Sequence, residues 1–465
     1  MSSPPATADR TVALNRFGLG RRPADPLPSD PRDWLLGQLD AYSPAAPALS
    51  DALPSARIAA DYAEGREEFR DGESAEQKMA ARKALRQKGQ ALYRSEVEMR
   101  VAAALETDTP FVERLVHFWS NHFAISANKP QVTVLAGAFE REAIRPHVLG
   151  RFEDMLVAVE RHAAMQVFLD QVRSVGPNSR FAERAAARNA ARKPGINENL
   201  AREIMELHTL GVRTGYTQAD VTEFALALTG WSVGRMGAAS QDQDPGVFAF
   251  RPALHEPGTR TIRGKAYPQD GEVQARAVLA DLAASEATAR HLATKLARHF
   301  IADEPPADVI DALAAAYLES GGDLPAVYRA LVAHPLAWTP QPAKFKTPWE
   351  WTVSSLRGLG WRTAPDKLPL APLLNQLGQP TWRPGSPAGY DDIAASWAAP
   401  DALVRRVEVA QRFANRAPDG LDARELAPEL FPDTLSPLTS REIDRAESAR
   451  TALALLLVSP DFQRR

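Results

Sequence analysis

A long helix-forming segment without proline most constrains what this chain can fold into. Residues 75–106 are mainly Ala, Arg, Lys, Glu and Leu, which favour a helix about 45–50 Å long. Helical patterns recur over most of the remaining chain. Only the Gly- and Pro-rich segment around residues 246–267 has the short alternating runs of a β-hairpin. The sequence therefore predicts an all-α protein, mainly helical, formed by one large multi-helix unit with a minor β-hairpin.

The domain organisation follows from the distribution of proline, glycine and charge. Residues 1–10 are predicted to form a flexible tail and residues 11–465 a single helical unit. An alternative division has two lobes, 11–170 and 195–465, joined by a basic loop at 172–195. That loop is either a solvated connection or a mobile lid that attracts an anionic substrate or partner.

Charge and composition exclude several partners and chemistries. The 55 basic and 58 acidic residues leave a formal net charge of −3, so we expect no nucleic-acid partner. The absence of cysteine excludes disulfides, thiolate nucleophiles and cysteine-ligated metals. No apolar run of about 18 residues is present, so we expect no membrane span. The N-terminus lacks the apolar core of a signal peptide, which predicts a cytoplasmic protein as written, and a periplasmic or secreted one if a signal peptide was removed.

Several ordered motifs carry a family resemblance. The most distinctive is NENLAREIMELHTLGVRTGYTQADVTEFALALTGW at 197–231. It is accompanied by NRFGLG (15–20), HFWSNHF (117–123), HEPGTRTIRG (255–264), ATARHLATKLARHF (287–300), KTPWEWTVSSLRGLG (346–360) and LGQPTWRPGSPAGY (377–390). With these motifs the chain resembles, over essentially its whole length, the bacterial family catalogued as domain of unknown function 1800. Glu256, Arg260 and Tyr390 depart from the Asp, Lys and Trp usual in that family.

The resemblance implies a partner but no reaction. Relatives often lie beside genes for a second family, domain of unknown function 1501, which is similar to sulfatase-like hydrolases. A sulfatase-like protein is therefore the partner that the resemblance suggests. Many relatives carry an export signal, which this chain lacks.

The helix that opens the distinctive segment carries a polar face. At 100° per residue, Asn199, Arg202, Glu203 and Glu206 share one face, whereas His208 points elsewhere. The two carboxylates can divide acid and base roles or share one divalent metal ion, and the guanidinium can clamp a carboxylate or phosphate. The same four residues also suit a structural salt-bridge network, so both interpretations stay open.

Two further segments contribute histidines to the predicted site. His122 lies on an aromatic stripe of the helix at 111–123, where it is either a core residue or a base that meets the polar face. His255 lies in the predicted hairpin region, and loop residues often carry function. We expect these three segments to converge on one pocket. The predicted catalytic residues are Glu203, Glu206, His122 and His255, and the predicted substrate-binding residues are Asn121, Asn199 and Arg202.

Three basic residues fall inside apolar helical patterns, where an unpaired charge is unfavourable. They are Lys295, Lys346 and Arg357. We expect each to pair with an acidic residue such as Glu350.

Two functional hypotheses remain. The sequence contains no G-x-S-x-G, P-loop or H-E-x-x-H signature, which excludes the easily recognised hydrolases, nucleotide binders and zinc proteases. One hypothesis is a hydrolase-like enzyme with a Glu/His acid–base site, with or without one divalent metal ion, in a helical core. The other is a non-catalytic accessory or scaffold protein that docks the sulfatase-like partner.

Overall fold

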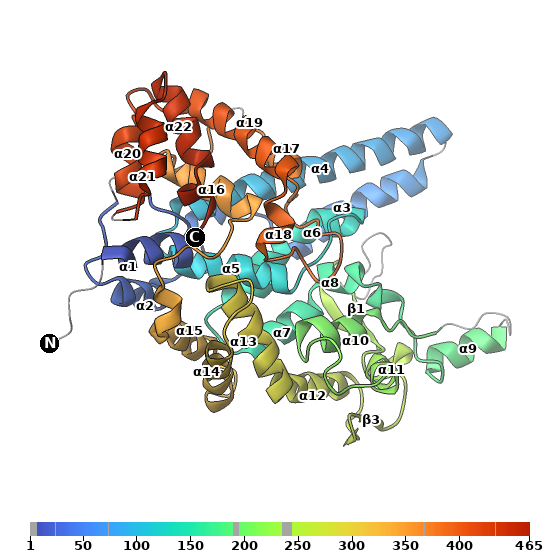
Figure 1. Ribbon diagram of the computed structural model, residues 1–465. Coiled ribbons are helices and arrows are strands. Elements are labelled where there is room, and N and C mark those ends of the chain that lie inside the picture. The colour runs from blue at the N-terminus through green and yellow to red at the C-terminus, as the bar shows by residue number, and fades with distance from the viewer. Residues whose placement is uncertain are drawn as a thin grey trace.

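Helices dominate the computed structural model of the chain (Figure 1). The structure describes residues 7–23, 25–72, 74–188, 195–234, 244–365, 368–432 and 434–465. Within these ranges the strands form only two small antiparallel two-stranded sheets. The predicted fold class, mainly helical with a minor β component, is therefore confirmed.

The elements follow one another with short connections. The first part of the chain forms α1 (Thr7–Val12), η1 (Ala13–Phe17), α2 (Pro31–Ala41), η2 (Pro47–Leu49), α3 (Ser55–Asp71) and α4 (Ala75–Glu106). The next part forms α5 (Pro110–His122), α6 (Pro130–Phe139), η3 (Glu140–Ile144), η4 (Arg145–His147), α7 (Phe152–Arg161), α8 (Ala163–Phe168), η5 (Gln171–Arg173), α9 (Arg180–Arg188), α10 (Asn199–Glu203), η6 (Ile204–His208) and α11 (Gln218–Ala227).

The remaining elements include all the strands described. They are β1 (Trp231–Val233), β2 (Phe248–Phe250), η7 (Pro252–Leu254), β3 (Arg260–Ile262), β4 (Lys265–Tyr267), α12 (Glu272–Ala283), α13 (Glu286–Phe300), α14 (Ala307–Glu319), α15 (Leu324–Ala333) and η8 (Pro335–Trp338). The C-terminal part forms α16 (Pro348–Gly358), α17 (Leu370–Gln376), α18 (Ala394–Trp397), α19 (Pro400–Arg416), α20 (Ala423–Leu430), α21 (Pro437–Asp444), α22 (Ala449–Val458) and α23 (Pro460–Gln463).

A single connected cluster of buried apolar side chains extends from Val12 to Phe462. Helix α5 lies in its middle, between the C-terminal helices α16 and α19–α22 and the helices α12–α15 (Figure 1). Phe17, Phe111 and Phe300 join η1, α5 and α13, with ring centroids 5.6–5.8 Å apart. Aromatic pairs at this spacing stabilise the core beyond their buried area. The packing therefore fixes α5 and α13, the two helices that later form the site, against each other.

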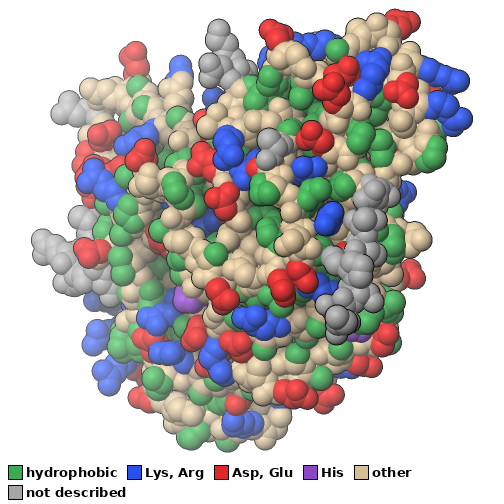
Figure 2. Space-filling model, turned by 90° about the vertical axis from the view of Figure 1, so that its left-hand side faces the viewer, with side chains coloured by type: hydrophobic (Ala, Val, Ile, Leu, Met, Phe, Trp, Pro, Cys, Tyr) green, Lys and Arg blue, Asp and Glu red, His purple; other side chains and the backbone are tan. Residues whose placement is uncertain are grey.

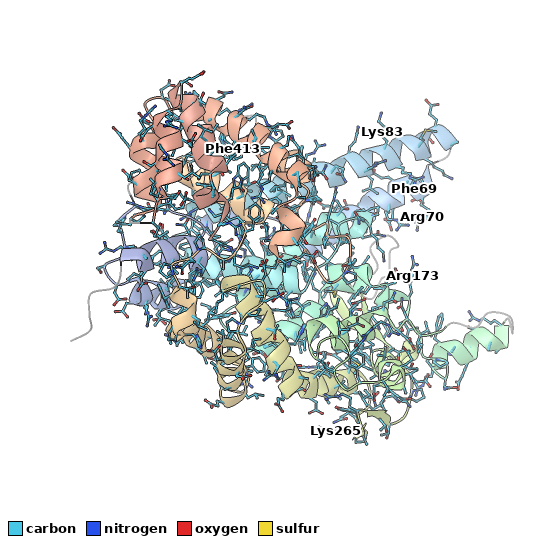
Figure 3. The ribbon with its side chains drawn as sticks, in the orientation of Figure 1. Phe69, Arg70, Lys83, Arg173, Lys265 and Phe413 are labelled. Atoms are coloured by element: carbon cyan, nitrogen blue, oxygen red, sulfur yellow. The ribbon has the colours of Figure 1, made fainter. Side chains whose placement is uncertain are left out.

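Helix α4 has the bounds predicted from the sequence, and with α3 it forms an arm that projects from the body (Figure 1). Ser74 caps its N-terminus and Gln77 completes the capping box, which satisfies the first free backbone N–H groups. The tip of the arm is largely exposed, and Figure 3 shows Phe69 and Lys83 on it. Only the C-terminal half of α4, from Tyr93 onward, enters the core.

The β structure differs in detail from the prediction. The sequence predicts one hairpin around residues 246–267, and β3 and β4 form a hairpin in that range. A second sheet pairs β2 with β1, which precedes the predicted region. Trp231 and Val233 of β1 are buried, so tertiary packing rather than a local turn signal accounts for this strand.

Two predictions about irregular segments need correction. The sequence predicts a loop at 172–195, but Arg180–Arg188 form α9, because this Ala- and Arg-rich run contains no proline. The rest of that loop, residues 189–194, lies outside the described residues. The predicted flexible tail covers residues 1–10, of which 1–6 are likewise not described and 7–10 belong to α1.

The surface carries charges of both signs. Figure 2 shows acidic and basic side chains interspersed over one face of the molecule, in keeping with the small net charge. Among the described helices, none is both long and apolar enough to cross a membrane.

Candidate functional site

A cavity of about 220 Å³ lies between α5, α13, the start of α16 and the loop at 379–392. Aromatic rings form part of its wall, from Phe118, Trp349, Trp382 and Tyr390. The charged and histidine residues that line it are Arg100, Arg114, His117, His122, Lys295, Arg298, His299, Glu350, Asp391 and Asp392. So many ionisable groups around one cavity suit a site that binds and transforms a polar molecule.

His299 and Asp392 form a histidine–carboxylate pair in this wall. His299 lies in the last turn of α13, and its Nδ1 is 2.5 Å from Oδ2 of Asp392. The carboxylate accepts this hydrogen bond, so Nδ1 carries the proton and Nε2 is left as an acceptor. Nε2 is buried and has no hydrogen-bond partner in the part of the chain that is described.

Burial and neighbouring charges set the protonation of this pair. Burial lowers the pKa of His299 more than Asp392 raises it, so the imidazole is neutral at pH 7. Burial opposes ionisation of Asp392, but His299, Lys344 and Arg465 outweigh it and lower the pKa of that carboxyl to about 2. A neutral histidine held by a permanently ionised carboxylate is the arrangement of a general base and its orienting group.

The other buried carboxylate of the cavity, Glu350, is fully occupied by cations. It pairs with Arg114 and lies 2.8 Å from Nη2 of Arg465. It also accepts a hydrogen bond from the backbone N–H of Thr347, because Thr347 and Glu350 form the capping box of α16. The guanidiniums hold the pKa of Glu350 well below its ordinary value despite burial.

Asn121 holds the loop that closes the cavity. Its side-chain amide donates to the backbone carbonyl of Tyr390 at 2.9 Å and accepts from the Tyr390 N–H at 2.8 Å. Gly389 has a φ of +84°, and a Cβ there would lie 2.3 Å from the carbonyl oxygen of Asn121. Glycine at this position therefore permits both the turn and the close approach. Asn121 lines the cavity, but its hydrogen-bonding groups are engaged in positioning the loop.

His117 belongs to a buried network behind the cavity. Its Nδ1 accepts from Nε1 of Trp349 at 3.1 Å, and its Nε2 lies 3.2 Å from Glu113. Glu113 in turn binds Arg145 through two hydrogen bonds. Burial lowers the pKa of His117 to about 4, so this ring stays neutral and structural at pH 7.

The expected acidic partners of the three basic residues in apolar helices are only partly found. Arg357 donates to backbone carbonyls of Gly20 and Ala104 instead, because these ends of η1 and α4 lie against it. Lys346 donates to Ser354 and feels Glu350 at longer range. Lys295 makes no hydrogen bond or ion pair with any described residue.

His122, predicted as catalytic, lines the same cavity. Its Nε2 lies 3.1 Å from the backbone carbonyl oxygen of His208, so α5 touches η6 at this point. Its Nδ1 is buried without a partner among the described residues, and burial lowers its pKa well below the ordinary value. His122 is thus a neutral ring at the cavity wall.

The predicted polar face at 199–206 is not part of the cavity lining. Asn199 is exposed, and Arg202 bonds at the surface to Glu198 and Gln218 at 3.2 and 2.8 Å. Glu203 is half-buried, and burial raises its pKa. Glu206 accepts a hydrogen bond from Tyr216.

The 100° periodicity fails beyond Glu203 because Ile204–His208 form a π-helix, η6. A π-helix turns less per residue than an α-helix, so it changes which side chains share a face. His208, which the helical wheel separates from the other polar groups, is fully buried and lies 2.7 Å from Glu160. The buried acid–histidine contact of this segment is therefore His208–Glu160.

His255 is buried in the β region, apart from the cavity lining. Its Nδ1 donates to the backbone carbonyl of Thr229 at 2.8 Å. Its Nε2 has no hydrogen-bond partner among the described residues, with Asp270 4.0 Å away. Asn178 binds the neighbouring Glu256. The predicted residues therefore occupy three places: Asn121 and His122 at the cavity, Asn199, Arg202, Glu203 and Glu206 on α10–η6, and His255 by the strands.

A metal site has no ligand set in the described part of the chain. No three His, Asp or Glu side chains there are grouped closely enough to hold an ion. The acid–base arrangement is thus the one that the described side chains support directly.

His299, Asp392, Lys344 and Arg465 are absent from the site predicted from the sequence. One signal could have indicated His299: it follows Lys295 by four residues in ATARHLATKLARHF, which places both on one face of an otherwise apolar helix. Asp392, Lys344 and Arg465 have no such local signal, because each lies on another segment of the chain.

Fold and site define the class of this protein: a large, mainly helical protein with a charged cavity at a histidine–carboxylate pair. The chain belongs to the family described as protein of unknown function DUF1800, whose model matches residues 12–464. No curated protein and no solved structure matches the chain.

Proposed function

We propose that this chain is a hydrolase-like enzyme in which His299 is the general base and Asp392 its orienting group. The observation that carries the proposal is the pair itself: Nδ1 bonds to Asp392 at 2.5 Å, and Nε2 is left without a partner in the wall of the cavity. A buried histidine that has only a structural role normally satisfies both ring nitrogens.

The chemistry is activation of water by proton transfer. Nε2 of His299 takes a proton from a water molecule as its oxygen attacks the electrophilic atom of the substrate, and the imidazolium later returns that proton to the leaving group. Asp392, ionised throughout, stabilises the imidazolium. General-base catalysis of this kind contributes about 10²–10⁴-fold to a rate.

A panel of chromogenic esters, phosphate esters and sulfate esters tests this proposal. We expect the wild-type protein to hydrolyse at least one class and His299→Gln to lose at least about 100-fold in kcat. His147→Gln is the matched control, because His147 is half-buried outside the cavity lining. Absence of hydrolysis by the wild type, or equal activity of His299→Gln, contradicts the proposal.

The projecting arm favours a second candidate function, that of an accessory protein for a sulfatase-like partner. A groove of about 860 Å³ lies between α3, α4 and α6. Its basic lining residues are Arg66, Arg82, Lys83, Arg86 and Arg383. Tyr62, Phe69 and Leu85 add apolar surface, so the groove suits an acidic, partly apolar segment of a partner.

Co-expression with the sulfatase-like gene product tests this candidate. We expect the two proteins to co-purify, and the double change Lys83→Glu and Arg86→Glu to abolish the complex by reversing charge in the groove. The double change Lys265→Glu and Arg290→Glu, outside the groove lining, is the control. No complex, or one indifferent to the arm variant, counts against the accessory function.

A further inference from the structure

We infer that the cavity binds an oxyanion group of its substrate, a carboxylate, phosphate or sulfate, through Lys295 with help from Arg298 and Arg100. The inference rests on the proposed function, because it treats the cavity of His299 as the substrate site. It adds the substrate class, a small molecule or chain end that carries a compact negative charge.

The first step is that the buried carboxylates of the cavity are already paired. Glu350 is neutralised by Arg114 and Arg465, and Asp392 by His299 and Lys344. The third carboxylate, Asp391, is exposed and accepts a hydrogen bond from Ser396. The cavity therefore offers no interior carboxylate that is free to bind a cation.

The second step is that cationic donors remain. Lys295 has no hydrogen bond or ion pair with a described residue, although it lines the cavity. Arg298 uses Nε for the backbone carbonyl of Asp303, and Arg100 uses Nε for Glu140. No described residue bonds the terminal nitrogens of either guanidinium. Three cations thus have donors left over at one cavity.

The third step concerns Lys295 itself. Burial lowers its pKa to about 8, and Asp392 offsets this only in part. The ammonium is still mostly charged at pH 7, in surroundings that penalise an unpaired charge. An oxyanion would relieve that penalty through charge-assisted hydrogen bonds, which are stronger than neutral ones.

The fourth step is the position relative to the base. Lys295 and His299 are four residues apart on α13, so their side chains are neighbours on one face. An anion held by Lys295 would lie about one helical turn from Nε2 of His299. The rings of Trp349 and Trp382, against which Arg100 packs at 4.0 and 5.5 Å, supply flat surface for the rest of the substrate.

Calorimetric titration of the full chain at low ionic strength with inorganic phosphate, sulfate and acetate tests the inference. We expect at least one of the three to bind, Lys295→Met to weaken binding at least about tenfold, and Lys295→Arg to retain most of it. Lys265→Met is the control, because Lys265 pairs with Asp281 at the other end of the molecule from the arm (Figure 3). Which anion binds most tightly identifies the group.

The outcomes separate this inference from the proposed function. No binding of any anion by the folded wild type, or equal binding by Lys295→Met, overturns the anion site even if hydrolysis is found. Anion binding that depends on Lys295 in a protein without hydrolytic activity supports the anion site and counts against the enzyme. We also expect binding to weaken above about pH 8, where Lys295 loses its charge.

Discussion

Helix α13 and the segment α10–η6 both carry charged residues among apolar ones, yet they use them in opposite ways. On α13, Lys295 and His299 face a cavity and leave donor or acceptor atoms unpaired. On α10, Arg202 is about one-third exposed and pairs with Glu198, four residues before it. The first arrangement is unfavourable for folding alone, whereas the second is ordinary helix-surface pairing.

This difference teaches that spacing identifies polar faces but not their use. The polar face of α10 is conspicuous in the sequence because four polar residues share it. The polar atoms of α13 are inconspicuous because leucine and alanine surround them. Burial without a partner, which only the fold reveals, is the stronger indication of a site.

The largest expected effect on stability is at the cavity wall. Glu350→Gln should lower the free energy of unfolding by about 3–5 kcal/mol, because it leaves the buried guanidiniums of Arg114 and Arg465 without their common carboxylate. Urea denaturation at pH 7 measures this. A loss below about 1 kcal/mol would mean that the cavity wall is no more strongly coupled than the surface of α10.

An effect of opposite sign is expected at Lys295. Its pKa falls from 10.5 to about 8 on folding, so the unfolded state binds more protons between these values and stability rises with pH there. Below about pH 8 the charged side chain destabilises the fold. Lys295→Met should therefore raise stability at pH 7, by up to about 3 kcal/mol, and abolish the rise between pH 8 and 10.5.

Unfolding titrations at several pH values distinguish this from a structural role. Lys295→Arg, which keeps the charge, should not gain stability. If Lys295→Met is instead less stable than the wild type at pH 7, the ammonium stabilises the fold, and the contrast with α10 disappears.

The smallest effect is expected on α10. Glu198→Gln should change stability by less than about 1 kcal/mol, because the carboxylate is partly exposed to solvent, where it bonds Thr222, Gln218 and Arg202. The change should shrink further at 1 M salt, which screens exposed pairs. A thermal melt at two salt concentrations checks this, and a loss as large as that of Glu350→Gln would show that the polar face is a buried network.

Local rules explain which parts of the fold could be predicted. The bounds of α4 follow from the composition of 75–106 together with a capping box, and both depend only on neighbouring residues. The strand β1 and the π-helix η6 could not be predicted, because packing and not local propensity determines them. The loop prediction at 172–195 is wrong at α9, where basic residues were given more weight than helix propensity.

The site was predictable only in part for the same reason. Asn121 and His122 lie on a helix whose motif is visible in the sequence, and both line the cavity. Asp392 is 93 residues from His299, so only the tertiary fold joins them. The side chain of Arg465 likewise reaches this cluster from the last residue of the printed sequence.

The account's central claim is that the cavity of α13, and not the polar face of α10–η6, is the functional centre. The most direct test compares His299→Gln with Glu206→Gln on the same substrate of the chromogenic panel, with far-UV circular dichroism confirming that both remain folded. The account predicts that His299→Gln loses at least about 100-fold in kcat, whereas Glu206→Gln stays close to the wild type. Loss of activity in Glu206→Gln with activity retained in His299→Gln would contradict it and place the site on the polar helix.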